Sequence, residues 1–127
     1  MPMLELNVRK NEEIVKVKGG TAETRALDWN SEVDSSIEPF DLIVASDCVY
    51  YHEGVNGLIN TIHRLATTET EIYVSQENRS YSETQSQVWK NFCTQVVEYF
   101  KVKIIPMSQQ HEDYRSGDIY LMQLMKK

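Results

Sequence analysis

A short apolar run, Leu42-Ile-Val-Ala45, is the feature that most limits what this chain can fold into, and carboxylates bound it at Asp41 and Asp47. A continuous apolar run of this kind suits a strand that is covered on both faces, as in a parallel sheet. In open α/β sheets, ligands bind outside the carboxyl ends of such strands. Asp47 and Tyr50 therefore lie where a fold of this type does its chemistry.

The residues that follow this run alternate between helical and extended patterns. Apolar residues recur at helical spacing over residues 55–66 and again over residues 82–100, which predicts two helices that each pack one face inward. Residues 71–75 predict a strand between them. Two further strands, at residues 102–105 and 119–125, are separated by a polar loop and are expected to pair as an antiparallel hairpin at the edge of the sheet.

The N-terminal third of the chain carries weaker patterns. Residues 2–10 predict a short helix, and residues 16–20 predict a polar linker with a Gly-Gly break. Residues 24–27 are expected to form a short strand that ends at Asp28 and Trp29. An acidic, serine-rich loop then leads to the central apolar run.

Strands that are separated by helices predict an α/β fold with a mainly parallel sheet and a C-terminal antiparallel hairpin. The 127 residues are enough for a single domain with one core. There are 19 acidic and 13 basic residues, a net charge of -6, and no basic stripe, which argues against a dedicated nucleic-acid binder. No apolar run approaches the roughly 20 residues that span a bilayer, so no membrane partner is expected.

The location expected from the sequence is the cytoplasm. The first residues lack the charged-then-apolar pattern of a signal peptide. Cys48 and Cys93 show no metal or redox spacing, which favours a reduced, intracellular compartment. His52 and Glu53 lie near Asp47, but they crowd into one loop without a helical ligand pair, so no metal site is expected.

Several stretches of the chain resemble the seven-strand, S-adenosylmethionine-dependent protein-lysine methyltransferases. Asp47-Cys-Val-Tyr50 is similar to the Asp-x-x-Tyr motif of that family, and it follows Ala26-Leu-Asp-Trp29 in the family's order. Within the family, the chain is most similar to the branch that methylates the valosin-containing AAA ATPase. The resemblance implies the C-terminal part of a Rossmann-like class I methyltransferase sheet. The other stretches that carry the resemblance are residues 4–11, 77–80 and 112–118.

One part of the family's pattern is missing from this sequence, the glycine-rich cofactor loop. In the family, that loop lets the backbone approach the cofactor closely. A truncated or degenerate methyltransferase, impaired in binding S-adenosylmethionine, is therefore expected. Two alternatives are a non-catalytic fragment that binds a protein partner and a methyltransferase with a non-lysine substrate. None of the chain's glycines forms a G-x-G pattern after a strand; they are Gly19, Gly20, Gly54, Gly57 and Gly117.

The resemblance assigns catalysis to Asp47 and Tyr50. A substrate lysine is protonated at neutral pH and must lose its proton before it attacks a methyl group. A carboxylate holds and orients the ammonium, and an aromatic ring lines a slot for the aliphatic stem. From the residues alone, Asp47 is equally well explained as a helix N-cap or loop carboxylate, and Tyr50 and Tyr51 as partly buried packing residues.

The resemblance also places Asp28 and Trp29 beside the adenine ring of S-adenosylmethionine, Asp28 through a hydrogen bond and Trp29 through ring contact. Ala45 lies near the carboxyl end of the apolar strand, where a small residue leaves room for a cofactor. The alternatives from the residues alone are a core tryptophan at a strand end and an ordinary core alanine.

Three further residues are expected to contact a protein substrate. Tyr51 follows the Asp-x-x-Tyr motif, and Glu77 and Arg79 lie in the loop that borders the substrate entrance in the resembling family. The alternative for Glu77 and Arg79 is an exposed ion pair, which contributes little to stability. The partner expected from the resemblance is a protein with an accessible lysine, such as an AAA ATPase or another chaperone-like protein.

Overall fold

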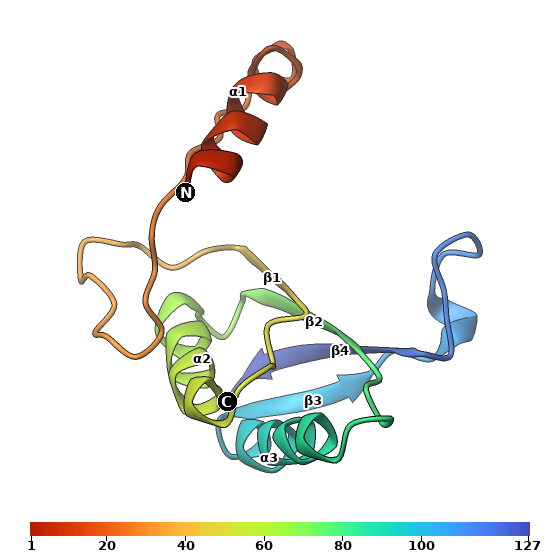
Figure 1. The fold of residues 1–127 in the computed structure, drawn as a ribbon. Helices are drawn as coiled ribbons and strands as arrows, with labels where there is room; N and C mark the ends of the chain where they lie inside the picture. Colours follow the sequence, from red (N-terminus) through yellow and green to blue (C-terminus); the bar gives the residue numbers. More distant parts are fainter.

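The computed structural model describes residues 1–127, which form a small mixed sheet, two helices that cover one face of it and an N-terminal helix that projects away (Figure 1). The elements in chain order are α1 (Pro2–Val17), β1 (Leu42–Ser46), α2 (His52–Leu65), β2 (Glu71–Glu77), α3 (Glu83–Tyr99), β3 (Phe100–Ile104), the 3-10 helix η1 (Met107–Gln109) and β4 (Ile119–Lys126).

The four strands form one sheet in the order β1-β2-β4-β3. Strands β1 and β2 pair in parallel, whereas β4 is antiparallel to both β2 and β3. It follows that β1, β2 and β3 run in the same direction and that β4 alone opposes them. The mixed α/β fold and the C-terminal antiparallel hairpin expected from the sequence are confirmed.

The hairpin of β3 and β4 forms one edge of the sheet, as the sequence predicts. Strand β4 lies inside the sheet, and β3 is the outer strand. Met122 and Leu124 of β4 are buried, whereas Lys101 and Lys103 of β3 are exposed. The apolar strand therefore takes the protected central position, and lysines occupy the edge, where charge discourages pairing with other chains.

Helices α2 and α3 cover the same face of the sheet and form the core with it (Figure 1). Each helix presents an apolar stripe at helical spacing, and Ile59 and Phe92 are completely buried. Burying one such side chain stabilises the fold by about 1.5–3 kcal/mol. The largest fully buried side chains are Phe92, Phe100, Ile59, Ile72, Leu124, Val55, Val74, Val88 and Val96.

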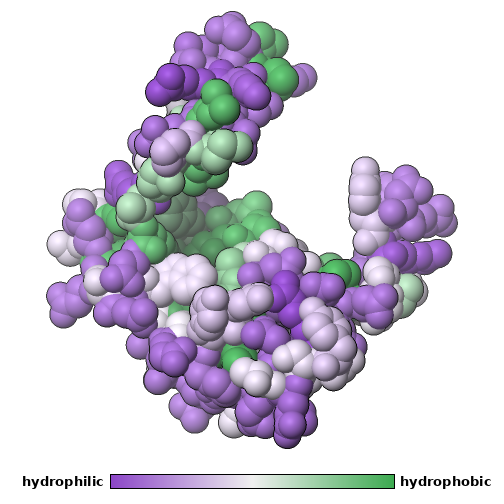
Figure 2. Space-filling model, in the orientation of Figure 1, coloured by the Kyte–Doolittle hydropathy of each residue, from purple (hydrophilic) through white to green (hydrophobic).

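The opposite face of β1 and its outer edge are uncovered. Because β1 pairs only with β2, its other edge has no strand beside it. Leu42 is 55% exposed and Val44 is 67% exposed, both on the face away from Ala45. Figure 2 shows a hydrophobic hollow between the N-terminal arm and the rest of the molecule. The strand that the sequence predicts to be covered on both faces is thus covered on one face only.

Helix α1 projects away from the sheet and is longer than predicted (Figure 1). The expected end near residue 10 is wrong, since the helix continues to Val17 and buries none of its residues. An ion pair between Glu12 and Lys16 at 2.7 Å supports the extra turns. Gly19, at φ 77°, then ends the helix in a Schellman motif, in which Gly20 N–H donates to the carbonyl of Val15.

The predicted strand at residues 24–27 is also wrong, because these residues form no strand and pair with no neighbour. An extended segment becomes a strand only where another strand satisfies its backbone groups, and none lies beside it. The remaining boundaries differ by a few residues: β2 continues to Glu77, and β3 begins at Phe100. None of the helices combines the length and the apolar character needed to cross a membrane.

Candidate functional site

The turn after β1 holds Asp47 in an unusual backbone conformation. Asp47 is the one non-glycine residue with a positive φ, 51°. Aspartate tolerates this left-handed region better than most residues do. Two hydrogen bonds to β2 fix the turn: Asp47 N–H donates to the Ser75 carbonyl at 2.9 Å, and Asp47 Oδ1 accepts from Glu77 N–H at 2.9 Å. The carboxyl ends of β1 and β2 are thereby joined.

Asp47 does not cap the following helix, which was the alternative left open by the sequence. Helix α2 begins at His52, its N-cap position is Tyr51, and no side chain accepts a hydrogen bond there. The Asp47 carboxylate, which is 47% exposed, instead faces the loop after β2. Its position at the carboxyl end of β1 is where α/β sheets bind ligands.

Two glutamine side chains hold the rest of this turn in place, and the sequence analysis did not identify them. Gln76 is 3% exposed, and its Oε1 accepts a hydrogen bond from Val49 N–H at 3.2 Å. Gln85, at the start of α3, donates from Nε2 to the Tyr50 carbonyl at 3.1 Å. A signal for Gln76 was present, because the alternation of β2 points this amide toward the core beside Ile72 and Val74.

Arg79 lies at the centre of the charged groups beside this turn. Its Nε donates to Glu77 Oε2 at 3.1 Å, and its Nη2 is 4.0 Å from Asp47 Oδ1. Its guanidinium carbon lies 4.8 Å from the centroid of the Tyr50 ring, a cation–π contact. Desolvation lowers the pKa of Arg79, but the hydrogen bond and charge of Glu77, with smaller contributions from Tyr50 and Tyr81, raise it, and the net pKa is raised. Arg79 is therefore a permanent cation.

Four predicted site residues are thus brought together: Asp47, Tyr50, Glu77 and Arg79. Tyr51 adjoins them, with its ring centroid 4.9 Å from that of Tyr50 in an edge-to-face arrangement. Tyr50 is 42% exposed and Tyr51 is 67% exposed, so both rings are open to a ligand. We refer to Asp47, Tyr50 and Glu77 as the cation site, because all three contact the Arg79 guanidinium.

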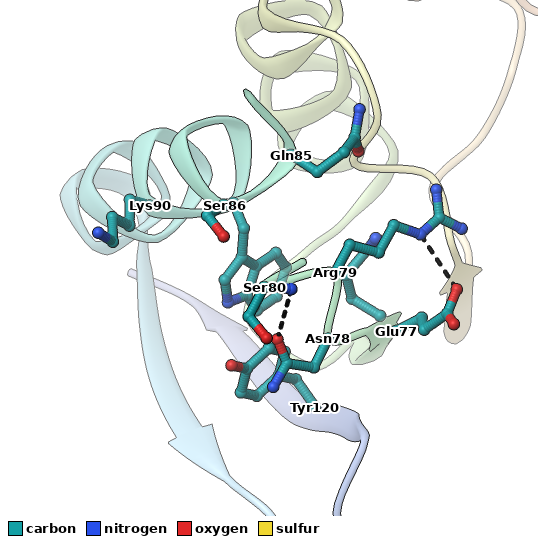
Figure 3. Close-up of a pocket in the computed structure, with 10 residues that line it drawn as sticks. Glu77, Asn78, Arg79, Ser80, Gln85, Ser86, Lys90 and Tyr120 are labelled. Atoms are coloured by element: carbon teal, nitrogen blue, oxygen red, sulfur yellow. Dashed lines mark hydrogen bonds and ion pairs between the residues drawn. The ribbon is translucent and has the colours of Figure 1, made fainter. Parts of the chain in front are cut away.

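A cavity of about 270 Å³ lies next to the cation site, between the loop after β2 and helix α3 (Figure 3). Its wall is mostly polar and includes Asn78, Ser80 and Ser86. Trp89 and Tyr120 form its aromatic part, with their rings stacked at 5.3 Å. Figure 3 shows the Arg79 side chain extending from the rim of this cavity toward Glu77.

Asp28 and Trp29 come before the acidic loop, and the Trp29 ring lies beside Gly54 in the first turn of α2. Both oxygens of Asp28 accept hydrogen bonds within its own turn, from Asn30 N–H at 2.9 Å and from Ser31 Oγ at 2.8 Å. The bond from the Asn30 backbone is the main reason that the pKa of Asp28 is lowered. In this structure the carboxylate organises its own loop.

Trp29 is partly buried against α2 and the core. Its carbonyl oxygen approaches Gly57 so closely that a Cβ at that position would lie 2.4 Å away. Trp29 also lines a cavity of about 450 Å³, together with Asn60 and Arg64 of α2. Trp29 can therefore be a core residue and still contact a ligand, since one part of it packs against the core and another part lines a cavity.

Ala45 is 8% exposed and belongs to the core cluster under α2 and α3. Its methyl group points to the covered face of the sheet, opposite to Val44. This burial agrees with the alternative of an ordinary core alanine, and its assignment to a cofactor site stays a prediction.

The two thiols offer no activated nucleophile, and the histidine of α2 lies away from the cation site. Burial raises the pKa of Cys48 and of Cys93, which disfavours the reactive thiolate. Burial, followed by the charge of Lys126, lowers the pKa of His63. His63 packs against the rings of Tyr99 and Phe100, at 5.6 Å and 5.8 Å, away from the cation site.

Two comparisons with known proteins bear on this site. A sequence model described as lysine methyltransferase matches residues 1–99. The fold is similar to the crystal structure of the PH0226 protein from Pyrococcus horikoshii OT3, with a TM-score of 0.60 and 12% sequence identity. That similarity covers 94% of this chain but 66% of the other, so this chain spans just under two thirds of the length of that protein. At this identity, the likeness shows the fold alone.

Proposed function

This chain belongs to the lysine methyltransferase family, and on that premise we propose that the cation site binds the side chain of a substrate lysine for N-methylation. The observation that carries the proposal is the convergence of the Asp47 carboxylate and the Tyr50 ring on one cation, Arg79. Such a pair recognises an ammonium in the same way, through charge and through the ring face.

Each group of the cation site has a separate task in this proposal. The Asp47 carboxylate orients the substrate nitrogen, and its turn is fixed by β2 before any substrate arrives. The Tyr50 ring lines the path of the aliphatic stem. Tyr51, which is the more exposed ring, and Glu77 contact the substrate around that path. The lysine leaves its proton to solvent before its nitrogen reacts, since the ammonium form has no free electron pair.

The methyl donor that the family uses is S-adenosylmethionine, whose sulfonium makes the methyl group reactive without a metal. Trp29 and the adjoining cavity of about 450 Å³ suit a purine in size, and an aromatic side chain is an apt neighbour for one. Asp28 would have to release one of its two turn hydrogen bonds to contact such a ligand. No glycine-rich turn follows β1 or β2, so we assign only the adenine side of the donor to this chain.

The finer identity of the substrate is part of the proposal. Sequence resemblance to the branch that acts on the valosin-containing AAA ATPase makes an ATPase of that class the first candidate. A second candidate function, binding a protein partner without catalysis, is favoured by the uncovered edge of β1, where Leu42 and Val44 are exposed.

Methyl transfer to an AAA ATPase substrate tests the proposal directly. The chain is incubated with the substrate and with S-adenosylmethionine at a concentration high enough to offset the weak donor binding expected of this chain, and methylated lysines are identified by mass spectrometry. Asp47→Asn should reduce transfer by about 100-fold or more, because the amide keeps the shape of the carboxylate but not the charge that holds an ammonium. Asp113→Asn, at an exposed carboxylate in the loop before β4, is the matched control and should leave transfer unchanged. Near-normal transfer by Asp47→Asn would remove the catalytic assignment.

A further inference from the structure

Arg79 makes the contacts that the proposed function reserves for the substrate. It is a cation beside the Asp47 carboxylate, at 4.0 Å, and over the Tyr50 ring, at 4.8 Å. Its side chain is only 17% exposed, whereas those of Asp47 and Glu77 are 47% and 46% exposed. The guanidinium is therefore the covered member of the cluster, and the groups that hold it are partly open to solvent.

A single carboxylate and a single ring face cannot hold two cations at full strength. A lysine ammonium placed over Tyr50 would lie beside the guanidinium, and two like charges at such a separation repel each other. The ring face itself accommodates one cation at contact distance. The substrate lysine and Arg79 must therefore compete for the same position.

The structure offers Arg79 an alternative position. Arg79 lies in the short loop between β2 and α3, where its carbonyl accepts a hydrogen bond from Ser82 N–H at 3.0 Å. Its side chain already lines the polar cavity of about 270 Å³, together with Asn78 and Ser80 (Figure 3). Glu77 also borders that cavity, and a guanidinium that turned into the cavity would leave the face of the Tyr50 ring.

We propose that Arg79 is an internal competitor of the substrate, which occupies the cation site until a lysine side chain displaces it. This inference rests on the proposed function of the cation site and adds a selectivity device to it. Displacing Arg79 costs free energy, which contacts made by neighbouring residues of the substrate must offset. An isolated lysine side chain therefore binds weakly. Arg79 is thus a specificity-determining residue, because it excludes cations that bring no further contacts.

Binding of n-butylammonium, which reproduces the end of a lysine side chain, tests this inference without a methyl donor. The probe is titrated into the full chain, and the ring signals of Tyr50 are followed by NMR. Arg79→Met, which keeps an unbranched flexible stem and removes the charge, should lower the Kd of the probe by about tenfold. The Kd of the probe for Arg79→Lys should stay closer to that of the parent chain, because a positive charge remains at this position. Arg25→Met, at an exposed arginine paired with Glu23, is the matched control and should change nothing.

A second measurement applies to the parent chain and does not depend on whether Arg79→Met folds. Nuclear Overhauser contacts between the Arg79 side chain and the Tyr50 ring should disappear as n-butylammonium saturates the site. If these contacts persist at saturation, or if Arg79→Met binds the probe no better than the parent, Arg79 is a fixed support of Tyr50 and the inference is overturned.

The same titration separates this failure from a failure of the proposed function. Asp47→Asn should weaken probe binding in both the parent and the Arg79→Met background, since Asp47 supplies the charge. If Asp47→Asn weakens binding but Arg79→Met does not strengthen it, the cation site stands and only the competitor role fails. If the probe binds without any dependence on Asp47, both proposals fail.

Discussion

The side chain of Asp47 accepts a hydrogen bond from the backbone N–H of Glu77 at 2.9 Å, which joins the ends of two parallel strands by a contact outside their ladder. The bond uses Oδ1, and the carboxylate remains 47% exposed. One residue therefore serves both the turn and the cation site, and substitutions can separate these two roles.

Asp47→Asn should leave the stability of the chain nearly unchanged, while Asp47→Ala should not. Asparagine retains an oxygen that can accept from Glu77 N–H, and it tolerates the φ of 51°. Alanine lacks the acceptor, and the left-handed backbone at this residue would lower the free energy of unfolding by about 1–2 kcal/mol. The free energy of unfolding from urea titrations measures both effects. Equal losses for the two variants would mean that the charge of Asp47, and not its hydrogen bond, stabilises the turn.

Gly57→Ala should destabilise the chain by about 1–3 kcal/mol, because the new methyl group would meet the Trp29 carbonyl oxygen at 2.4 Å. Gly54→Ala, one turn earlier in α2, has its nearest atom at 4.0 Å and is the matched control. It should gain up to about 1 kcal/mol from the helix propensity of alanine. Thermal melts compare the two. A Gly57→Ala variant as stable as the parent would show that the segment at Trp29 shifts freely.

Calorimetry should show weak or undetectable binding of S-adenosylmethionine to this chain, since no glycine-rich turn approaches such a ligand. Any binding that is detected should fall further in Trp29→Ala, because Trp29 lines the cavity assigned to the adenine side. Trp89→Ala, at a half-buried tryptophan of the other cavity, is the control and should not weaken it. Affinity typical of an intact methyltransferase would mean that another segment replaces the glycine turn.

Self-association through β1 should be detectable and should depend on Val44. The outer edge of β1 carries unpaired backbone groups beside exposed Leu42 and Val44, an arrangement that invites pairing with another chain. Val44→Lys should reduce the associated fraction in sedimentation velocity experiments. Val97→Lys, at an exposed valine of α3, is the control for added charge and should have a smaller effect. A strictly monomeric parent chain at high concentration would contradict this expectation.

The elements with strong periodicity could be predicted from the sequence alone. The apolar run at Leu42, the two amphipathic helices and the last two strands all lie where the pattern places them, because burial against one core imposes that pattern. The prediction of a strand at residues 24–27 was wrong because no such burial or pairing supports it. Propensity indicates an extended backbone, but a strand also requires a neighbour that no local pattern reveals.

In the candidate site too, the residues with a local sequence signal could be predicted, and the contacts between distant segments could not. Asp47 and Tyr50 could be identified from their place after a strand, whereas the position of Arg79 over Tyr50 depends on how two loops meet. The end of α1 is an intermediate case. The Gly-Gly pair marks a break, but the Schellman bonds at Gly19 and Gly20 decide where the helix stops.

The central place of β4 in the sheet has a consequence for synthesis of the chain. Tyr73 of β2 pairs with Gln123 of β4. The sheet that carries the cation site is therefore completed only by residues that are synthesised about 50 positions later. Until residues 119–126 emerge, β2 has only β1 beside it, and its other edge carries unpaired backbone groups. Nascent chains of this protein should therefore engage chaperones that shield strand edges until the last strand arrives, because non-local pairing is slow and its precursors are prone to aggregation.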